Sequence, residues 1–353
     1  MQSFRHLDRH LGLTPASILR QLSAIDTGRG QQNAFRRQSP EALKTLTEIA
    51  RIQSVEASNA IEHITAPARR IKELVAQKTT PRNRSEAEIA GYRAVLEQIH
   101  SNAAAIPFKP TVVEQLQRDL YQFTGIRAGR WKTGDNIVEE ELPDGTKRIR
   151  FKPVTARETP AAMQELHERF NEAWGADTYH RLQLTGVYVL DFLAIHPFSD
   201  GNGRMSRLLT LLLLYRSDYE VGRFISIEKL IEQTKESYYD ALGASTTRWH
   251  EGEHDLGPWL SYFLGILVAA YREFEQRVGV VSGGRGTKAA AIRSFIGSRT
   301  SDLVAVEDVR RAVPSASDVY IREVLRKLRK EGVLKVEGVG PQAKWRRVRA
   351  DFE

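Results

Sequence analysis

The sequence predicts a mainly α protein: a helical bundle interrupted by one β-hairpin, followed by a small C-terminal winged helix-turn-helix unit of helices and strands. Two observations predict this class. Windows with helical periodicity recur through the first 278 residues, with few strand signals among them. A glycine-rich linker at 282–286 then precedes a shorter stretch with a different pattern of helices and strands.

Helical periodicity defines most elements of the first part, and turn-forming clusters at 79–83 and 101–102 separate some of them. Two of the expected helices, 185–195 and 208–214, are apolar on nearly every side, so we expect both to be buried. The expected helices are 14–24, 41–62, 84–100, 110–122, 158–174, 185–195, 208–214, 227–243 and 257–278.

The clearest strand signal before the linker lies within 136–153. Residues 137–142 and 146–151 predict two strands, and Pro143-Asp144-Gly145 between them predicts the turn of a β-hairpin. Acidic residues in the first strand and basic ones in the second suit an exposed edge that must not aggregate.

After the linker, helical patterns at 288–296, 304–313 and 317–332 precede strand patterns at 333–337 and 344–348. Three helices followed by a hairpin is the order of a winged helix-turn-helix. Residues 285–353 include 16 basic and 9 acidic residues, a net charge of +7, and the whole chain has a net charge of +8. This excess predicts DNA binding, with dimerisation or target docking as the alternative. The basic residues expected on the third helix and the wing are Arg322, Arg326, Lys327, Arg329, Lys330, Lys344, Arg346, Arg347 and Arg349.

The length and composition of the chain limit the number of domains and the kinds of site it can contain. A chain of 353 residues is long enough for two or three domains, which we expect at 1–105, 106–280 and 285–353. The absence of cysteine excludes disulfides and thiolate metal sites. The N-terminal residues have no apolar signal-peptide region and the apolar stretches are too short to span a bilayer, so we expect a soluble cytoplasmic protein without a membrane partner.

Most candidate catalytic and phosphate-binding residues lie in 196–207, a polar segment between the two most apolar expected helices. His196 precedes Pro197, which disfavours the α region and should end the first of these helices. Gly201-Asn202-Gly203 lets the backbone turn tightly and direct its N–H groups at an anion, at the positive end of the next helix. The segment therefore predicts a phosphate site.

The side chains of this segment complete the prediction. Arg204 and Arg207 share one face of the helix that follows and can reach adjacent phosphates. Asp200 offers a hard oxygen to Mg²⁺, and His196 can act as a general base near neutral pH. Together they favour phosphoryl or nucleotidyl transfer. No GxxxxGK[ST] run occurs, so the loop is not a Walker P-loop.

Each feature alone has a simpler explanation. A lone histidine after an apolar helix is more often a cap, and Gly-Asn-Gly alone is a turn. Two arginines at a helix start are unfavourable next to the helix dipole unless an anion lies between them. Their convergence in twelve residues favours the functional interpretation.

Residues 196–207 resemble the motif HPFx[D/E]GNGRxxR of Fic-domain enzymes at every defined position. The resemblance extends over about 36–278 and includes SEAEIAGYRAVL (Ser85–Leu96) and SYYDAL (Ser237–Leu242). It implies a Fic-type helical bundle in which the hairpin is a flap. It also implies transfer of AMP from ATP to a Ser, Thr or Tyr hydroxyl of a protein, with release of pyrophosphate.

The resemblance assigns a role to each residue. His196 would take the hydroxyl proton and Asp200 would hold Mg²⁺, while Arg207 would bind the γ-phosphate of ATP. The α- and β-phosphates would lie against the loop and Arg204, and the adenosine near a pair of tyrosines. The implied nucleotide-binding residues are Gly201, Asn202, Gly203, Arg204, Arg207, Tyr238 and Tyr239.

Gly203 discriminates within this family. A relative that phosphorylates its target has Lys there, which reverses the nucleotide, so glycine favours adenylylation. Transfer of another nucleotide, such as UMP, stays an alternative. The implied partner is a protein substrate docked as an added strand on the 137–151 hairpin.

Upstream, Ser58 to Glu62 resembles the family's inhibitory motif [S/T]xxxE[G/N], and the spacing puts Ser58 and Glu62 on one helix face. A carboxylate on Arg207 would occupy the group that should hold the γ-phosphate. His63 departs from the motif's Gly or Asn, which puts the end of this helix in question.

Two further alternatives stay open. The competing class is a DNA-binding regulator, held on DNA by 285–353, in which the Fic domain serves as a nucleotide sensor. A homodimer is also compatible with the sequence.

Overall fold

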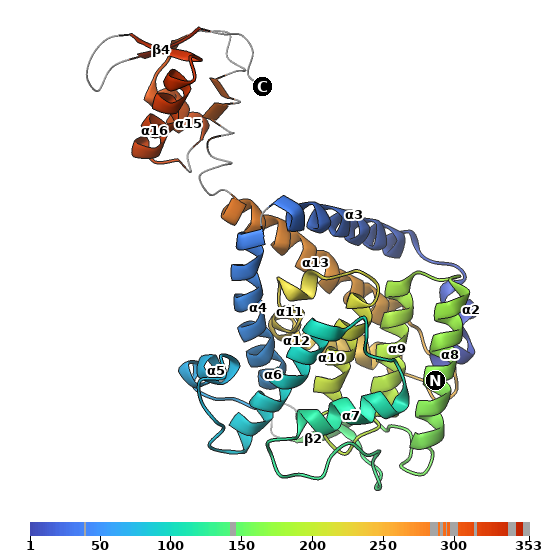
Figure 1. The fold of residues 1–353 in the computed structure, drawn as a ribbon. Coiled ribbons are helices and arrows are strands. Elements are labelled where there is room, and N and C mark those ends of the chain that lie inside the picture. Colours follow the sequence, from blue (N-terminus) through green and yellow to red (C-terminus); the bar gives the residue numbers. More distant parts are fainter. Residues whose placement is uncertain are drawn as a thin grey trace. The chain divides into compact units, whose positions relative to one another are not determined.

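The computed structural model describes residues 1–38, 40–141, 146–282, 289, 292–293, 295–296, 303–313, 316–337 and 344–348. They divide into two compact units, Met1–Glu275 and Gln276–Glu353 (Figure 1). The three domain ranges expected from the sequence stay predictions.

The first unit is a helical bundle. None of the helices that the structure describes is long and apolar enough to cross a membrane. The helices are α1 (Gln2–Arg5), α2 (Leu7–Leu11), α3 (Ala16–Gln38), α4 (Pro40–Ile61), α5 (Ala68–Val75), α6 (Arg84–Asn102), α7 (Pro110–Leu120), α8 (Thr159–Ala176), α9 (Arg181–Ile195), α10 (Asn202–Tyr215), a 3₁₀ turn (Val221–Arg223), α11 (Ile227–Gln233), α12 (Lys235–Thr246) and α13 (Gly257–Ser282).

Helices α9 and α10 form the centre of the bundle, as their all-round apolar sequences predict. They pack on each other, α8 covers α9, and α6 and α4 cover α10 (Figure 1). Nearly every side chain from Leu182 to Ile195 and from Met205 to Tyr215 is buried. The polar segment between these two helices is therefore anchored at both ends in the core.

Three parts of the helical prediction differ from the structure. Helix α3 continues to Gln38, well beyond the predicted window 14–24. The window 227–243 is not one helix, because the backbone of Thr234 leaves helical geometry and divides it into α11 and α12. The Thr234 hydroxyl donates to the Leu230 carbonyl at 2.9 Å, which ties the break to the end of α11. The short helices α1, α2 and α5 lie outside the predicted windows, because segments of four to eight residues show little periodicity.

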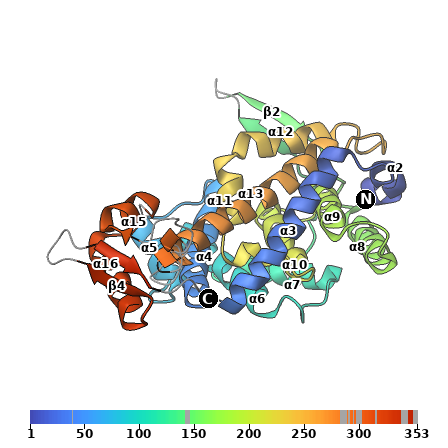
Figure 2. The same cartoon turned by 90° about the horizontal axis from the view of Figure 1, so that it is seen from above.

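The predicted hairpin is confirmed. Strand β1 (Val138–Glu141) pairs antiparallel with β2 (Lys147–Phe151), and the register places Glu139 opposite Ile149 and Glu141 opposite Lys147. The predicted turn residues 143–145 lie outside the described residues. The hairpin lies beside α12 (Figure 2).

The second unit has its own core and a three-stranded sheet. Its described elements are β3 (Leu303–Val304), α15 (Val306–Ala312), α16 (Asp318–Lys330), β4 (Leu334–Glu337) and β5 (Lys344–Arg347), with strand order β3-β5-β4. The core includes Ile321, Leu325, Leu328 and Trp345. The second and third expected helices and the two expected strands follow in the expected order, while the expected helix 288–296 lies partly outside the described residues. Strand β3 is an additional short strand that the sequence pattern did not indicate. The predicted turn 338–341 lies outside the described residues.

Candidate active site

Helix α9 ends at His196, as Pro197 predicts. His196 has φ 51° and ψ 61°, a left-handed conformation, and its N–H still donates to the Phe192 carbonyl at 2.9 Å. A non-glycine residue in this region is strained and needs support from its surroundings. That support comes from Lys132 and Asn136: the Lys132 N–H donates to the Pro197 carbonyl at 2.8 Å, and the Asn136 amide donates to Phe198 at 3.0 Å.

The His196 ring is half-buried and neutral at physiological pH. Burial lowers its pKa to about 4, and the Lys132 ammonium adds to this effect. Nδ1 lies 3.4 Å from the Leu193 carbonyl oxygen. When Nδ1 carries the proton that points at this carbonyl, Nε2 keeps the lone pair that a general base needs.

This environment predicts an unusual titration. Because burial favours the neutral imidazole, the pKa falls, and His196 should bind a proton only as the pH drops through about 4. A histidine with an ordinary pKa titrates near 6.5. NMR shifts of the ring protons, assigned by comparison with His196→Ala, measure the midpoint. A midpoint near 6.5 would show that burial does not lower the pKa of the His196 ring.

The loop before α10 has the geometry of an anion site. Gly201 has φ +83°, which a side chain would strain, and Gly203 follows in the first turn of α10. The Asn202 amide is used internally, because it accepts from the Phe198 N–H at 2.9 Å and donates to the Phe198 carbonyl at 2.8 Å. Asn202 therefore shapes the loop with its side chain and leaves its backbone N–H for an anion.

Asp200 fits a single-carboxylate Mg²⁺ site. Its side chain is 62% exposed; Oδ1 accepts from the Gly201 N–H at 2.6 Å, and Oδ2 lies 3.9 Å from an Arg84 nitrogen. Within the described ranges no group of three or more His, Asp or Glu could hold a metal ion. One carboxylate suits Mg²⁺, which keeps several waters and takes its other ligands from phosphates.

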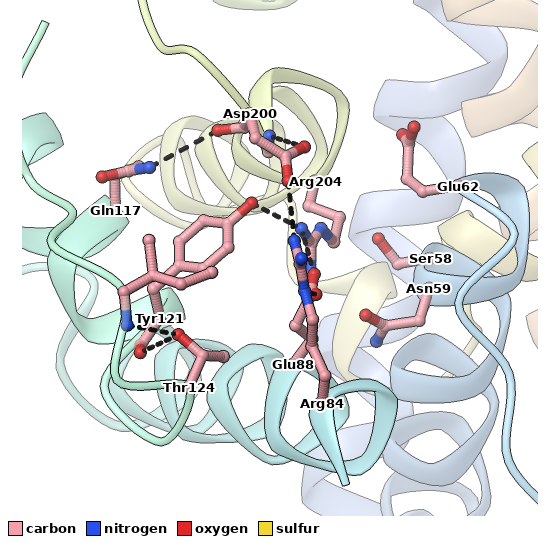
Figure 3. A network of polar contacts seen from close by, with 12 residues as sticks. Ser58, Asn59, Glu62, Arg84, Glu88, Gln117, Tyr121, Thr124, Asp200 and Arg204 are labelled. Atoms are coloured by element: carbon pink, nitrogen blue, oxygen red, sulfur yellow. Dashed lines mark hydrogen bonds and ion pairs between the residues drawn. The ribbon is translucent and has the colours of Figure 1, made fainter.

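Arg204 lies behind the loop and is 1% exposed. Its Nη2 donates to the Tyr121 hydroxyl at 2.7 Å and forms an ion pair with Glu88 at 2.7 Å (Figure 3). The predicted phosphate contact of this arginine stays a prediction, because its closest contacts here are protein groups.

Arg207 is paired with the predicted inhibitory residues. Its Nε donates to the Ser58 hydroxyl at 2.8 Å, and its Nη2 donates to the Ser58 carbonyl at 2.9 Å and to Glu62 Oε1 at 2.8 Å. Burial alone would raise the pKa of the Glu62 carboxyl, but Arg207 outweighs it and the pKa is lowered. The Arg207–Glu62 pair is therefore charged at physiological pH.

The end of α4 shows how His63 replaces the motif's Gly or Asn. His63 has φ 60°, so it takes the left-handed conformation that glycine and asparagine favour. The His63 N–H donates to the Ala60 carbonyl and the Ile64 N–H to the Asn59 carbonyl, both at 3.0 Å. These two bonds form a Schellman motif, and Lys235 Nζ donates to the Ile61 carbonyl at 2.9 Å. These bonds fix the backbone on both sides of Glu62 at the helix end.

A cavity of about 1080 Å³ joins these parts. The predicted base, the second arginine, the predicted inhibitor and both tyrosines line it together with residues of the hairpin. The lining includes Glu62, Ile137, Val138, Glu139, Arg150, His196, Gly203, Arg207, Tyr238 and Tyr239. Four segments that are distant in the sequence therefore meet at one site.

The two tyrosines differ in their surroundings. Tyr238 is buried against Trp259 and Tyr262, with ring centroids 5.8 Å from each. Tyr239 is half-buried, and the Arg150 guanidinium lies 5.1 Å from its ring centroid. Only Tyr239 offers much surface to the cavity, whereas Tyr238 mainly fills the core behind it.

Four residues around the site were not expected from the sequence. Glu88 and Tyr121 contact Arg204, and Lys132 and Asn136 hold the loop after α9. Glu88 lies within the Ser85–Leu96 segment singled out by resemblance, but one carboxylate among several carries no signal of burial. Tyr121 lies at the end of the predicted helix 110–122, where nothing in the sequence marks it as buried, and Lys132 and Asn136 come from a stretch without periodicity.

Residues 107–214 match the family model described as "Fic/DOC family". The match contains His196 and the whole loop through Arg207. The segment 107–214 is therefore similar to the Fic/DOC family, and the Fic family is a family of nucleotidyltransferases.

Its curated relatives are distant. A protein adenylyltransferase Fic from Aedes aegypti is 26% identical over 231 residues, which are 63% of this chain and 41% of the relative. The same-named protein of Drosophila melanogaster is 25% identical over 206 residues, 57% of this chain and 39% of the relative. The chain thus spans about two fifths of the length of these relatives.

Solved structures share the fold. A Fic family protein from Desulfovibrio desulfuricans superposes with a TM-score of 0.62 at 21% identity, covering 95% of this chain and 97% of that one. A Fic domain containing signaling protein from Bacteroides thetaiotaomicron gives 0.59 at 22% identity, covering 76% and 98%.

Proposed function

We propose that this protein transfers AMP from ATP to a Ser, Thr or Tyr hydroxyl of a protein, and to itself, and that Glu62 inhibits this reaction. The observation that carries the proposal is the 2.8 Å pair of Arg207 and Glu62 inside the cavity that also contains His196. The proposed general base, the anion loop and the inhibitory carboxylate of Glu62 therefore lie at one site.

The chemistry follows from the geometry of the loop. Nε2 of the neutral His196 accepts the proton of the target hydroxyl as its oxygen bonds to the α-phosphorus. The bond from that phosphorus to the α,β-bridging oxygen breaks, and pyrophosphate leaves. N–H groups at the start of α10 and the helix dipole stabilise charge on the phosphates.

Asp200 would hold Mg²⁺ through its exposed carboxylate. When bound, the ion neutralises charge on the phosphates and on the departing pyrophosphate. The hard carboxylate oxygen and its exposure fit this role.

Inhibition rests on competition for one guanidinium. Arg207 is buried, and Ser58 and Glu62 take up its Nε and Nη2. A γ-phosphate placed at Arg207 must displace Glu62. While Glu62 stays on Arg207, ATP would bind in an unproductive pose. The Glu62 side chain can leave Arg207 without unfolding α4, because Glu62 follows Ile61, the last residue of the helix.

The hairpin is the proposed docking site for the protein substrate. Ile137 and Ile149 are exposed large apolar side chains of this segment. Residues 137–139 and 150–151 also line the cavity, so a strand added to the hairpin would lie close to His196.

Mass spectrometry tests the activity directly. A cell lysate is treated with the Glu62→Gly variant and each nucleoside triphosphate in turn. Peptides that carry an added AMP on a hydroxyl side chain should appear only when ATP is the donor. The Glu62→Gly, His196→Ala double variant is the control. A UMP adduct instead would identify the other donor, and no adduct with any donor would refute the transferase.

The second candidate function is DNA binding through a winged helix at 285–353. It is favoured by the net charge of +7 in this range and by the described order of helices and sheet. The exposed face of α16 carries Arg326, Lys327, Arg329 and Lys330. In that case the Fic domain would serve as a nucleotide sensor.

DNA binding makes a distinct prediction. The chain of 353 residues should bind duplex DNA with an affinity that falls steeply as salt rises, because phosphate contacts release counterions. Replacing Arg326 and Lys327 with alanine should weaken binding to all DNA sequences. The slope of log K against log salt concentration should become shallower by about one for each lost phosphate contact. Fluorescence anisotropy measures this, with Arg69→Ala in the first unit as control. No binding at low salt would favour dimerisation or target docking.

A further inference from the structure

A buried polar cluster lies directly behind the anion loop. Arg204 from α10 contacts Glu88 from α6 and Tyr121 at the end of α7, each at 2.7 Å (Figure 3). All three side chains are almost completely buried. In such a place an ion pair with a hydrogen bond has a fixed geometry, because none of the partners can turn toward water.

The orientation of Arg204 depends on this one contact point. Both partners meet its Nη2. Among the residues that the structure describes, none accepts a hydrogen bond from its buried Nε or Nη1. Loss of either partner would therefore leave the guanidinium with one remaining contact.

Tyr121 also touches the loop itself. A Cβ built on Gly201 would lie 2.9 Å from the Tyr121 hydroxyl oxygen, so the loop backbone rests against this hydroxyl. On the same side Gln117 Nε2 donates to the Asp200 carbonyl at 3.4 Å (Figure 3). Helix α7 thus sets the position of the loop from behind.

Glu88 connects the cluster to the predicted Mg²⁺ carboxylate. Its Oε1 accepts from Arg84 Nε at 2.9 Å, and Arg84 Nη2 lies 3.9 Å from Asp200 Oδ2 (Figure 3). One buried carboxylate therefore orients two arginines, one behind the loop and one beside Asp200.

We propose that Tyr121 and Glu88 are positioning residues of the nucleotide site, which hold Arg204 and the 200–203 backbone in the geometry that receives the phosphates. This inference rests on the proposed function. Neither residue touches the cavity that would hold the nucleotide; each acts through Arg204, through Arg84 or through the loop backbone.

The test separates positioning from stability. In the Glu62→Gly background, Tyr121→Phe keeps the ring and removes one hydroxyl. Calorimetry with ATP and Mg²⁺ should show a Kd raised by about tenfold, which is the size expected from losing a hydrogen bond to a charged group. Glu88→Gln should raise the Kd as well. Thermal unfolding is measured on the same samples.

Tyr215→Phe is the matched control. Tyr215 is buried at the far end of α10, and its hydroxyl lies 3.0 Å from His100 Nε2. We expect this variant to lower Tm by as much as Tyr121→Phe does and to leave the Kd for ATP unchanged. Equal Kd values for the two tyrosine variants would overturn the inference while leaving the proposed function intact. A Glu62→Gly parent that binds no ATP would refute the proposed function, and the inference with it.

Discussion

Replacing Glu62 with glycine is expected to raise self-modification by about 5- to 150-fold, the range given by a coupling free energy of ~1–3 kcal/mol. The reason is Arg207, whose Nη2 loses its contact with Glu62 and then has one N–H available to the γ-phosphate, while the Ser58 carbonyl keeps the other. Incorporation of radiolabel from α-labelled ATP into the protein measures the change. Glycine is compatible with the end of a helix, so the variant should fold.

The second arginine provides the control for this result. Arg207→Ala in the Glu62→Gly background should cancel the gain, because the γ-phosphate then has no partner. Arg207 is buried, so the melting temperature of the double variant must be checked first. A folded double variant as active as Glu62→Gly would show that Glu62 acts in some other way.

His196→Ala in the derepressed protein is expected to abolish transfer. Loss of a general base typically costs about 10²–10⁴ in rate. The Kd for ATP should change little, because the proposed phosphate contacts come from the loop and from Arg207. Single-turnover rates and calorimetry on the same variant give both quantities.

A structural explanation of that loss must be ruled out. His196 caps α9 in a left-handed conformation, so alanine there could disturb the loop. Unchanged ATP affinity together with a lost rate identifies a chemical role. Full transfer activity in His196→Ala would exclude it as the base.

The sequence predicted the parts of this site that follow from local rules. A proline after an apolar helix marked the end of α9, and two glycines marked the loop. Ser58 and Glu62 were expected on one helix face, and both contact the same arginine. The strands of the hairpin were expected on either side of the turn residues 143–145, and they pair as expected.

The rest depends on contacts between distant segments. Nothing in the spacing of Glu88 or Tyr121 distinguishes them from surface residues, yet tertiary packing buries both against Arg204. The break at Thr234 has no proline or glycine to mark it, and the strand β3 has only two residues. Such features are determined by neighbours far away in the sequence, which a local pattern does not contain.

The first turn of α10 and the end of α4 approach each other closely. A Cβ built on Gly203 would lie 2.1 Å from Glu62 Oε1. Any side chain acquired at 203 would collide with the carboxylate as it stands, whatever its effect on a nucleotide. Because the clashing atom is the end of a flexible side chain, a residue acquired at 203 would push the Glu62 carboxylate away from its present position. One substitution at 203 would therefore change the anion loop and weaken the contact between Glu62 and Arg207 at the same time.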